Sequence, residues 1–384
     1  MFKDKTADPS LTYQLALLRI LMFDRPLKYL TQASTALENM RRGAPDATRE
    51  WRQAVETLFP IGLALSIVVG VALRFLWIGK REFWYDEVLS VLLSTGQKRL
   101  YRNPTDVPFS LSEMAPLLRV PVETGLGDSI STVEALLKGN LSEPHPPLLY
   151  LMTHGWMRLF GNSEVATRSP LLLMSLLALV AAYFLGRRIL GQRGGLIFTA
   201  LLALNPFFLS HSLNLRMYSP LDLWALLSAL CLFMLMGVDR SELAGLDLSG
   251  LDSLRSDYLG PSDQVAAWHR AMRIWPLRGA VAVALAAGVM TQYLFAYWFF
   301  ALAVVVLALD RPRWFVHGLT IAGGGLLFLP WALWGTLRQL SNRADVIERI
   351  STDGTVVSRI VGHSKDLAQP LAEYLLIGHL PMRM

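Results

Sequence analysis

The stretch LFPIGLALSIVVGVALRFLWI, residues 58–78, is followed almost at once by FWYDEVLS, residues 83–90. The first stretch is apolar and has about the 20 residues that a helix needs to cross a bilayer. The second places two adjacent carboxylates, Asp86 and Glu87, at the edge of the membrane. Ionisable groups at that depth are costly unless they face water, a cation or a partner, so we interpret the pair as a candidate functional site. The alternative is an acidic pair that only starts a helix, where carboxylates suit the N-terminal dipole.

The composition is that of a polytopic membrane protein. Of the 384 residues, 53% are hydrophobic and 17% are charged, whereas soluble proteins have about 25% charged residues. The formal net charge of +6 can be explained without a nucleic-acid partner, because the cytoplasmic loops of membrane proteins collect Lys and Arg. The single cysteine, Cys231, excludes an intrachain disulfide.

Further apolar segments predict an all-α protein, a module of about seven transmembrane helices. They cover residues 169–186, 196–211, 220–238, 274–309 and 316–337. The segment 274–309 is too long for one straight span, and the polar break at Thr291-Gln292-Tyr293 predicts two short helices joined by a tight external turn. Arg74, near the far end of the first span, is expected to reach the lipid headgroups.

The distribution of basic residues predicts the orientation in the membrane. Residues 80–167 form a large external loop, in which residues 148–160 are too few for a crossing and are expected to form a helix in the outer interface. With this topology the arginine clusters fall inside, as the positive-inside rule requires. These clusters are residues 187–193, 240–278 and 311–313.

The chain therefore divides into three predicted parts. Residues 1–57 are a basic cytoplasmic segment with an amphipathic helix, which lies on the inner membrane face or packs on the protein's own loops. Residues 58–337 are the transmembrane module. Residues 338–384 are an external C-terminal segment that ends without a helix cap, as expected for a fragment or for a long relative that stops early.

Several motifs gather on the predicted external side. Asp86-Glu87 follows the first span, and Arg216-Met217-Tyr218-Ser219 follows the third. The remaining motif residues are His145-Pro146-Pro147-Leu148-Leu149-Tyr150, Trp156, Phe160-Gly161, Arg168 and Leu329-Pro330-Trp331. In this order and spacing they resemble the GT-C membrane glycosyltransferases of the ArnT-like and protein-mannosyltransferase type, which use polyprenyl-phosphate sugars.

The resemblance covers roughly residues 58–337 and implies a seven-helix module with a large first external loop that carries an interfacial helix. Two positions depart from the family pattern. Asn214 stands where relatives often have an acidic residue, two positions before the motif arginine, and Gln292 stands where many have histidine. A second acidic group or a cation ligand is therefore missing at these positions.

For the chemistry, the resemblance implies that Asp86 is the general base that takes the proton of the acceptor hydroxyl. Glu87 would orient Asp86, or hold with it a divalent ion, Mg²⁺ or Mn²⁺, through carboxylate oxygens; the alternative for Glu87 is a solvated neighbour. Arg216 is expected to clamp the donor phosphate, because guanidinium pairs bidentately with phosphate oxygens. The alternative for Arg216 is a side chain that reaches the headgroups.

Four more residues are candidates for substrate binding. Tyr218 would hydrogen-bond the same phosphate, or belong to an interfacial aromatic belt. His145, stiffened by two prolines, would contact the phosphate or the acceptor, or only hydrogen-bond at a helix start. Gln292 and Tyr293 would line the donor groove. Asp222, inside the fourth span, would pair with Arg216 or lie in the interface.

The expected function is transfer of a sugar from a polyprenyl-phosphate donor to a lipid, glycan or protein acceptor at the external face of the inner membrane, by direct displacement with inversion. Two alternatives remain open, a transporter or flippase for lipid-linked glycans and an inactive scaffold. Transporters usually show internal repeats and polar or broken helices at mid-membrane. This sequence shows no repeat, and its charges gather at the outer edge, which favours the transferase.

Overall fold

The computed structural model describes residues 46–101, 114–237 and 261–342. Every regular element in these ranges is a helix, and several of the helices are long and apolar enough to cross a membrane. The predicted all-α polytopic fold class is therefore confirmed. The predictions for the amphipathic N-terminal segment and for the C-terminal segment fall mainly on residues 1–45 and 343–384, which lie outside the described residues.

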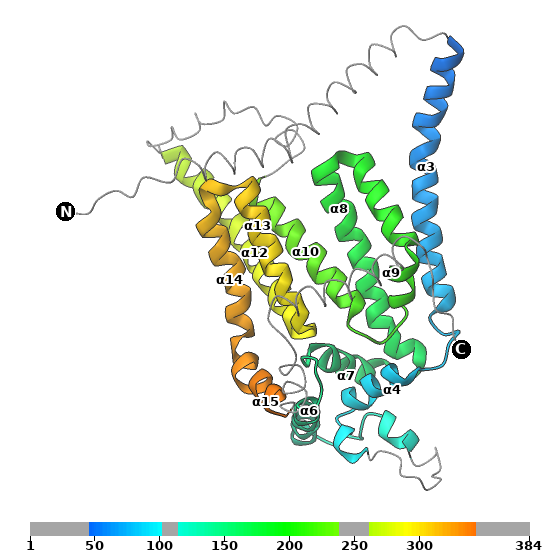
Figure 1. Cartoon of the computed structure of the whole chain (residues 1–384), viewed down its shortest axis with the longest axis vertical. Helices are drawn as coiled ribbons and strands as arrows, with labels where there is room; N and C mark the ends of the chain where they lie inside the picture. The colour runs from blue at the N-terminus through cyan, green and yellow to red at the C-terminus, as the bar shows by residue number, and fades with distance from the viewer. Residues whose placement is uncertain (1–45, 102–113, 238–260, 343–384) are drawn as a thin grey trace, which may run out of the picture.

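The long helices stand side by side as a bundle (Figure 1). They are α3 (Asp46–Trp77), α8 (Glu164–Leu204), α10 (Tyr218–Met236), α12 (Pro261–Thr291), α13 (Ala296–Leu309) and α14 (Trp314–Trp331). Within the described ranges, five helical stretches have the length and composition of a membrane span, and the stretch that contains α13 is a shorter apolar helix. With α13 included and the two arms of α8 counted separately, the described part of the bundle has seven long helical segments.

The helix α8 folds back on itself at Gly191, whose φ of 77° lies in the left-handed region that glycine tolerates best. The two arms then pack through glycines. A Cβ on Gly195 would lie 2.8 Å from the carbonyl oxygen of Tyr183. Small residues let helix backbones approach closely in membranes. The segments predicted as the second and third spans are therefore two arms of one hairpin, and the second arm continues through Asn205 into the short helix α9 (Pro206–His211).

The polar break in the long apolar segment lies where the sequence predicts it. The helix α12 ends at Thr291, a single turn η5 (Tyr293–Phe295) follows, and α13 runs back along the bundle. The last helical segment of the described bundle extends beyond the predicted span 316–337. After α14 the chain continues through a π-helical turn, η7 (Ala332–Thr336), into α15 (Leu337–Ser341).

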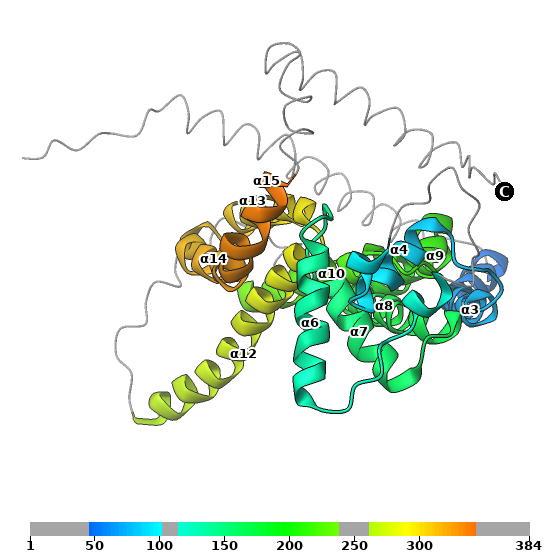
Figure 2. The same ribbon diagram turned by 90° about the horizontal axis from the view of Figure 1, so that it is seen from below.

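Three shorter helices, α4 (Tyr85–Ser94), α6 (Leu126–Asn140) and α7 (Leu148–Phe160), pack across one end of the bundle (Figures 1 and 2). Two single turns, η2 (Lys98–Leu100) and η3 (Ala115–Leu118), lie in the same segment. We call this region the α4–α7 end. The helix α7 has the bounds that the sequence predicts for the interfacial helix. The core of this end consists of Val91, Leu93, Leu136, Leu149, Tyr150, Met157, Leu171, Leu215 and Met217.

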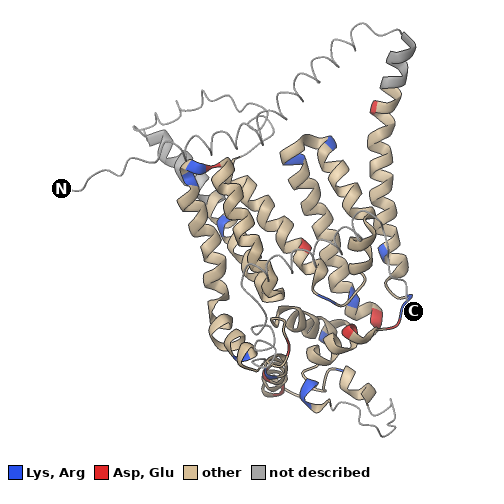
Figure 3. Ribbon diagram, viewed as in Figure 1, with Lys and Arg blue, Asp and Glu red and all other residues tan. Residues whose placement is uncertain are grey.

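The charged residues are concentrated at the two ends of the bundle (Figure 3). The fold-back of α8 near Gly191 and the turn η6 (Arg311–Arg313) both lie at the end opposite the α4–α7 end. These two turns contain the arginine clusters 187–193 and 311–313. The fold thus places both clusters on one side of the bundle, remote from Asp86.

Arg74 does not reach the headgroups, contrary to the prediction. Its side chain is fully buried and donates hydrogen bonds to the carbonyl oxygens of Gly70 and Ala203, both at 2.8 Å. The guanidinium also lies 5.0 Å above the ring of Phe208. A Cβ on Gly70 would lie 2.6 Å from the Ala203 carbonyl oxygen, so the close approach of α3 and α8 creates this carbonyl site. Arginines inside a membrane protein commonly face the bundle interior in this way.

The sequence assigns Trp156, Trp298 and Trp331 most simply to an interfacial aromatic belt, and in the structure their indole N–H groups are used inside the protein. Trp156 donates to the Ser169 hydroxyl at 2.8 Å, and Trp298 donates to the Ser228 hydroxyl at 3.0 Å. Trp331 is buried and donates to the Tyr293 hydroxyl at 3.0 Å. These hydrogen bonds give each indole N–H a partner inside the protein, and the place of the three residues in a belt stays a prediction.

Candidate active site

Asp86 and Arg216 meet at the α4–α7 end. Asp86 lies in the first turn of α4, and Arg216 lies in the short connection between α9 and α10. The Oδ2 atom of Asp86 and the Nη2 atom of Arg216 are 3.8 Å apart, and the two side chains are 34% and 14% exposed. The sequence predicted a role for each residue but not their contact. The fold thus joins a partly exposed carboxylate to a partly exposed guanidinium.

The start of α4 explains why the two adjacent carboxylates point to different places. Asp86 and Glu87 both lie in the first turn, where carboxylates suit the helix dipole. Successive residues on a helix are turned by about 100° because there are 3.6 residues per turn. Asp86 is therefore only half-buried, whereas Glu87 is fully buried and accepts a weak hydrogen bond from the Trp84 backbone N–H at 3.4 Å.

Glu87 forms a bidentate ion pair with Arg168, a residue of the first arm of α8. Arg168 Nε donates to Glu87 Oε1 at 2.8 Å, and Arg168 Nη2 donates to Glu87 Oε2 at 2.7 Å. The other guanidinium hydrogens go to backbone carbonyls, with Nη1 donating to Ile78 and Arg81 at 3.1 and 2.6 Å and Nη2 to Glu82 at 3.0 Å. An arginine has five N–H donors. All of them can thus be used here.

The same carboxylate also holds the chain segment that carries Arg216. Glu87 Oε1 accepts a hydrogen bond from the Leu215 backbone N–H at 2.8 Å. Glu87 therefore joins α4, the first arm of α8 and the connection before α10. Because Asp86 and Arg216 are the sequence neighbours of Glu87 and Leu215, this hub fixes the relative position of the two site residues.

These contacts correct the predictions for Glu87. It is not a solvated neighbour, since its side chain has no exposed surface. It also does not fit the predicted role of a metal ligand, because both of its oxygens already accept charge-assisted or backbone hydrogen bonds from Arg168, Leu215 and Trp84. Among the described residues there is no group of three or more His, Cys, Asp or Glu side chains that could hold an ion.

Arg216 keeps unused hydrogen-bonding capacity. Its Nε atom is buried and has no hydrogen-bond partner within the described part of the chain, and its one ion pair there, with Asp86, is long. A buried donor without a partner is costly. The guanidinium is therefore suited to receive an anion, which agrees with the role predicted for it.

Tyr150 is a further residue of this site that the sequence analysis did not select. It is fully buried in the core of the α4–α7 end. Burial raises the pKa of its hydroxyl; the positive charge of Arg216 opposes the rise, and the negative charges of Glu143 and Asp86 add to it. The charges of Asp86 and Arg216 therefore act on this ring. The sequence feature that could have indicated Tyr150 is its position as the last residue of the motif His145–Tyr150.

Tyr218, the first residue of α10, packs against His211 with ring centroids 4.0 Å apart and is half-buried. His211 Nδ1 also lies 3.4 Å from the side-chain nitrogen of Asn214. The proposed contact of Tyr218 with a phosphate stays a prediction. Asp222 forms no ion pair within the described residues, so the prediction that it pairs with Arg216 is wrong, because Arg216 meets Asp86 instead.

The structure brings His145, Gln292 and Tyr293 together in an internal network, a contact that the sequence did not predict. His145 Nδ1 lies 3.2 Å from Gln292 Oε1, which also accepts the Tyr293 backbone N–H at 3.1 Å. The Tyr293 hydroxyl contacts Gln339 Oε1 and accepts hydrogen bonds from Trp331 and Thr336, both at 3.0 Å.

Gln339 joins this network to the connection between α6 and α7. Its Nε2 atom donates to the carbonyl oxygens of Asn140 and His145 at 2.9 and 3.0 Å. The network therefore ties the α6–α7 connection to the turn after α12 and to α15. The Tyr293 hydroxyl is engaged in these bonds. The contact of His145 with a substrate and the lining of a donor groove by Gln292 and Tyr293 stay predictions.

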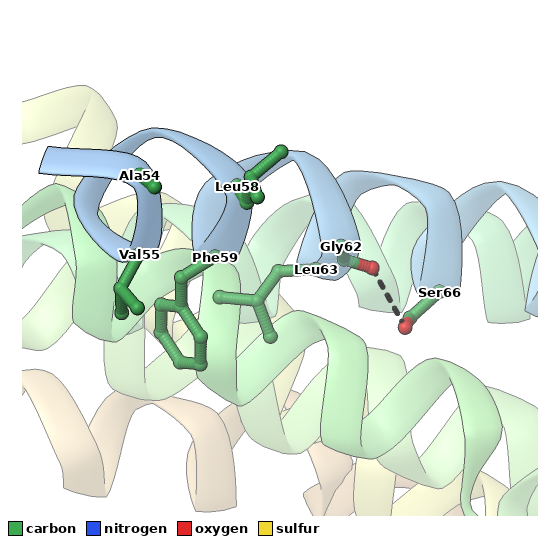
Figure 4. A pocket seen from close by; sticks show the side chains of 7 residues that line it. All are labelled: Ala54, Val55, Leu58, Phe59, Gly62, Leu63 and Ser66. Atoms are coloured by element: carbon green, nitrogen blue, oxygen red, sulfur yellow. Dashed lines mark hydrogen bonds between the residues drawn. The ribbon is translucent and has the colours of Figure 1, made fainter. Parts of the chain in front are cut away.

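Two hollows lie away from Asp86 and Arg216. One, of about 860 Å³, has Ala54, Val55, Leu58, Phe59, Gly62, Leu63 and Ser66 as its described lining (Figure 4). Its polar side chain, Ser66, already donates to the Gly62 carbonyl of the same helix at 2.9 Å. The other, of about 480 Å³, is an apolar groove between α7, the first arm of α8 and α10. The described lining of neither hollow contains charged groups like those of the Asp86–Arg216 pair.

No curated protein and no solved structure matches the chain. A family model does match, and its segment contains His145, Tyr150, Arg168, Arg216 and Tyr218. The resemblance predicted from the sequence motifs is therefore confirmed over this segment: residues 144–251 match the dolichyl-phosphate-mannose-protein mannosyltransferase family.

Proposed function

We propose that the protein is a membrane glycosyltransferase that moves a sugar from a polyprenyl-phosphate donor to a lipid, glycan or protein acceptor. The observation that carries the proposal is the contact of Asp86 with Arg216, 3.8 Å apart at one end of the bundle. The family match supports it, because that family is described as using dolichyl-phosphate mannose. Dolichyl phosphate is itself a polyprenyl-type phosphate carrier.

The two side chains supply the two charges that such a transfer needs. The acceptor hydroxyl gives its proton to the Asp86 carboxylate as its oxygen forms a bond with the anomeric carbon of the sugar. The bond from that carbon to the phosphate oxygen breaks, and the electron pair stays on the phosphate. Arg216 stabilises the negative charge that collects there. A single displacement of this kind inverts the configuration at the anomeric carbon.

The arginine-bearing turns support the orientation that we propose. The clusters 187–193 and 311–313 lie at the end of the bundle opposite Asp86 (Figure 3). Because cytoplasmic loops collect Lys and Arg, we assign that end to the cytoplasm. The α4–α7 end, with its candidate active site, then faces the external side of the inner membrane, and the N-terminus is cytoplasmic.

The donor atoms at the site do not favour a divalent ion. Glu87 uses both oxygens for Arg168 and the backbone, and Asp86 faces a guanidinium. We therefore propose that the transfer needs no Mg²⁺ or Mn²⁺. Addition of EDTA to the purified protein is expected to leave the rate unchanged, and restoration of a lost rate by Mn²⁺ would contradict this.

The test of the function is sugar transfer by the purified full chain from a labelled polyprenyl-phosphate sugar. Asp86→Asn is expected to lower the turnover by about a thousandfold, because it removes the general base. The matched control is Glu134→Gln, an exposed acid of α6 whose only ion pair within the described residues is with Lys138 on the surface. Equal turnover of Asp86→Asn and the wild type would remove Asp86 as the base.

A further inference from the structure

Three arginines near Glu87 and Asn214, at the α4–α7 end, differ in how their charge is balanced. Arg168 is neutralised by Glu87 in a buried bidentate pair. Arg216 faces Asp86 at 3.8 Å. Arg81 has no ion pair within the described residues, and its Nη2 donates to the side-chain oxygen of Asn214. Of these three guanidinium groups, that of Arg81 forms no ion pair with a described carboxylate.

Arg81 is held in place by its backbone, so it is not an ordinary surface arginine. Arg168 donates to the Arg81 carbonyl oxygen at 2.6 Å and to the carbonyls on either side, those of Ile78 and Glu82. The short connection between α3 and α4 is therefore wrapped around a buried guanidinium. The side chain of Arg81 extends from this anchored segment toward Asn214, with Nη2 also 3.5 Å from the Leu213 carbonyl oxygen.

Asn214 contacts the side chain of Arg81 and the backbone of Arg216. The side-chain oxygen of Asn214 accepts from Arg81, and its backbone oxygen accepts the Arg216 N–H at 2.8 Å. An amide oxygen can accept a hydrogen bond without neutralising the donor. A carboxylate at position 214 would form an ion pair with Arg81 instead. The neutral residue therefore leaves the charge of Arg81 available to a ligand.

We propose that Arg81 and Arg216 form a two-arginine site for a phosphate carried on a membrane lipid, with Asn214 as the neutral spacer between them. The identity of that lipid as the sugar donor rests on the proposed function. Two guanidinium groups suit a phosphate because each offers N–H donors in a planar fork. The buried Nε of Arg216, without a partner among the described residues, is one donor that such a ligand would satisfy.

The test is direct binding of farnesyl phosphate to the full chain in nanodiscs of a neutral lipid. Arg81→Gln is expected to weaken binding about tenfold, the typical effect of losing one charge-assisted contact. Asn214→Asp is expected to weaken it by a similar factor, because the new carboxylate neutralises Arg81. Arg81→Lys keeps the charge and is expected to retain part of the affinity. The matched control is Lys80→Gln, which removes the neighbouring exposed cation and is expected to change nothing.

Two further ligands separate the sources of the phosphate. Farnesol lacks the charge and inorganic phosphate lacks the lipid, and both are expected to bind at least tenfold more weakly than farnesyl phosphate. Binding of farnesyl phosphate that is unchanged in Arg81→Gln, or that falls equally in Lys80→Gln, would overturn the two-arginine site. Inorganic phosphate that binds as tightly as farnesyl phosphate would overturn the lipid assignment.

The outcome is separable from that of the proposed function. Transfer that depends on Asp86, with farnesyl phosphate binding unaffected in Arg81→Gln, would remove only the two-arginine site. Binding that depends on Arg81, in a wild-type protein that transfers no sugar, would remove only the transferase and point to a carrier. Gel filtration of each variant establishes that the protein is folded before its binding is compared.

Discussion

Two neighbouring carboxylates of α4 are each paired with an arginine, and the two pairs differ in burial, in distance and in their supporting hydrogen bonds. The Glu87–Arg168 pair is fully buried, bidentate and supported by backbone groups. The Asp86–Arg216 pair is partly exposed and long, with a buried guanidinium nitrogen that no described group satisfies. One helical step separates the two acids. The two acids therefore differ in how completely the hydrogen-bonding groups of their arginine partners are satisfied. We propose that this difference divides them into a structural pair and a reactive pair.

The comparison assigns different tasks to the two pairs. A saturated buried pair has no capacity left for a substrate, and it holds three chain segments in one geometry. In a weak, partly exposed ion pair, a ligand can replace either the carboxylate or the guanidinium at little cost in free energy. Chemistry that needs a free carboxylate and a free guanidinium is thus possible at Asp86 and Arg216, on a framework that Glu87 and Arg168 keep rigid.

The largest expected effect comes from breaking the buried pair. Glu87→Gln leaves the Arg168 charge without compensation in the core, and this is expected to lower the free energy of unfolding by about 3–5 kcal/mol. Asp86→Asn, one residue away, is expected to change it by less than about 0.5 kcal/mol because the site is partly exposed. Thermal unfolding of the two variants in the same detergent measures the difference. Equal destabilisation would refute the division into a structural and a reactive pair.

An intermediate effect is expected at the Tyr293 network. Tyr293→Phe removes a hydroxyl that contacts Gln339, Trp331 and Thr336. The loss is expected to destabilise the protein by about 1–2 kcal/mol, because it leaves polar partners unsatisfied. Sugar transfer below the unfolding temperature is expected to stay at the wild-type rate. A variant with normal stability and a strongly reduced rate would instead place the Tyr293 hydroxyl at the substrate.

The sequence predicts those features that depend on local chemistry. The bounds of α7 and the break after Thr291 follow from runs of apolar residues and from single polar interruptions, which act over a few residues. The sequence also predicts that the candidate site lies at one end of the bundle, because Asp86 and Arg216 both follow the ends of apolar segments. Each of these features can be recognised without knowing which residues touch.

The partners of the buried charges could not be predicted in the same way. The sequence shows that Glu87 and Arg168 are charged, but only the rotation of α4 against α8 makes one face the other. Arg74 is a similar case, because its partner is a carbonyl oxygen that becomes accessible where Gly70 meets Ala203. The hydropathy of a residue reflects the free-energy cost of burying it. It does not predict which tertiary contact offsets that cost.

The smallest expected effect belongs to an ion pair at the rim of the same end, Glu123 with Arg158. The hydrogen bond from Ser129 holds the pKa of Glu123 below its ordinary value of 4.5, with a further contribution from the Arg158 charge. Because Arg158 is 36% exposed, solvent screens the pair, and Glu123→Gln is expected to cost less than about 1 kcal/mol at pH 7.

The pH dependence of this rim pair has a definite sign. A carboxylate with a lowered pKa in the folded protein contributes stability above its ordinary pKa, and that contribution is lost as the pH falls through the lowered value. The difference in unfolding temperature between the wild type and Glu123→Gln should therefore be constant above about pH 5 and shrink at lower pH. A difference that persists at low pH would mean that the glutamine disturbs the packing of this end, and that the charge of Glu123 contributes little to its stability.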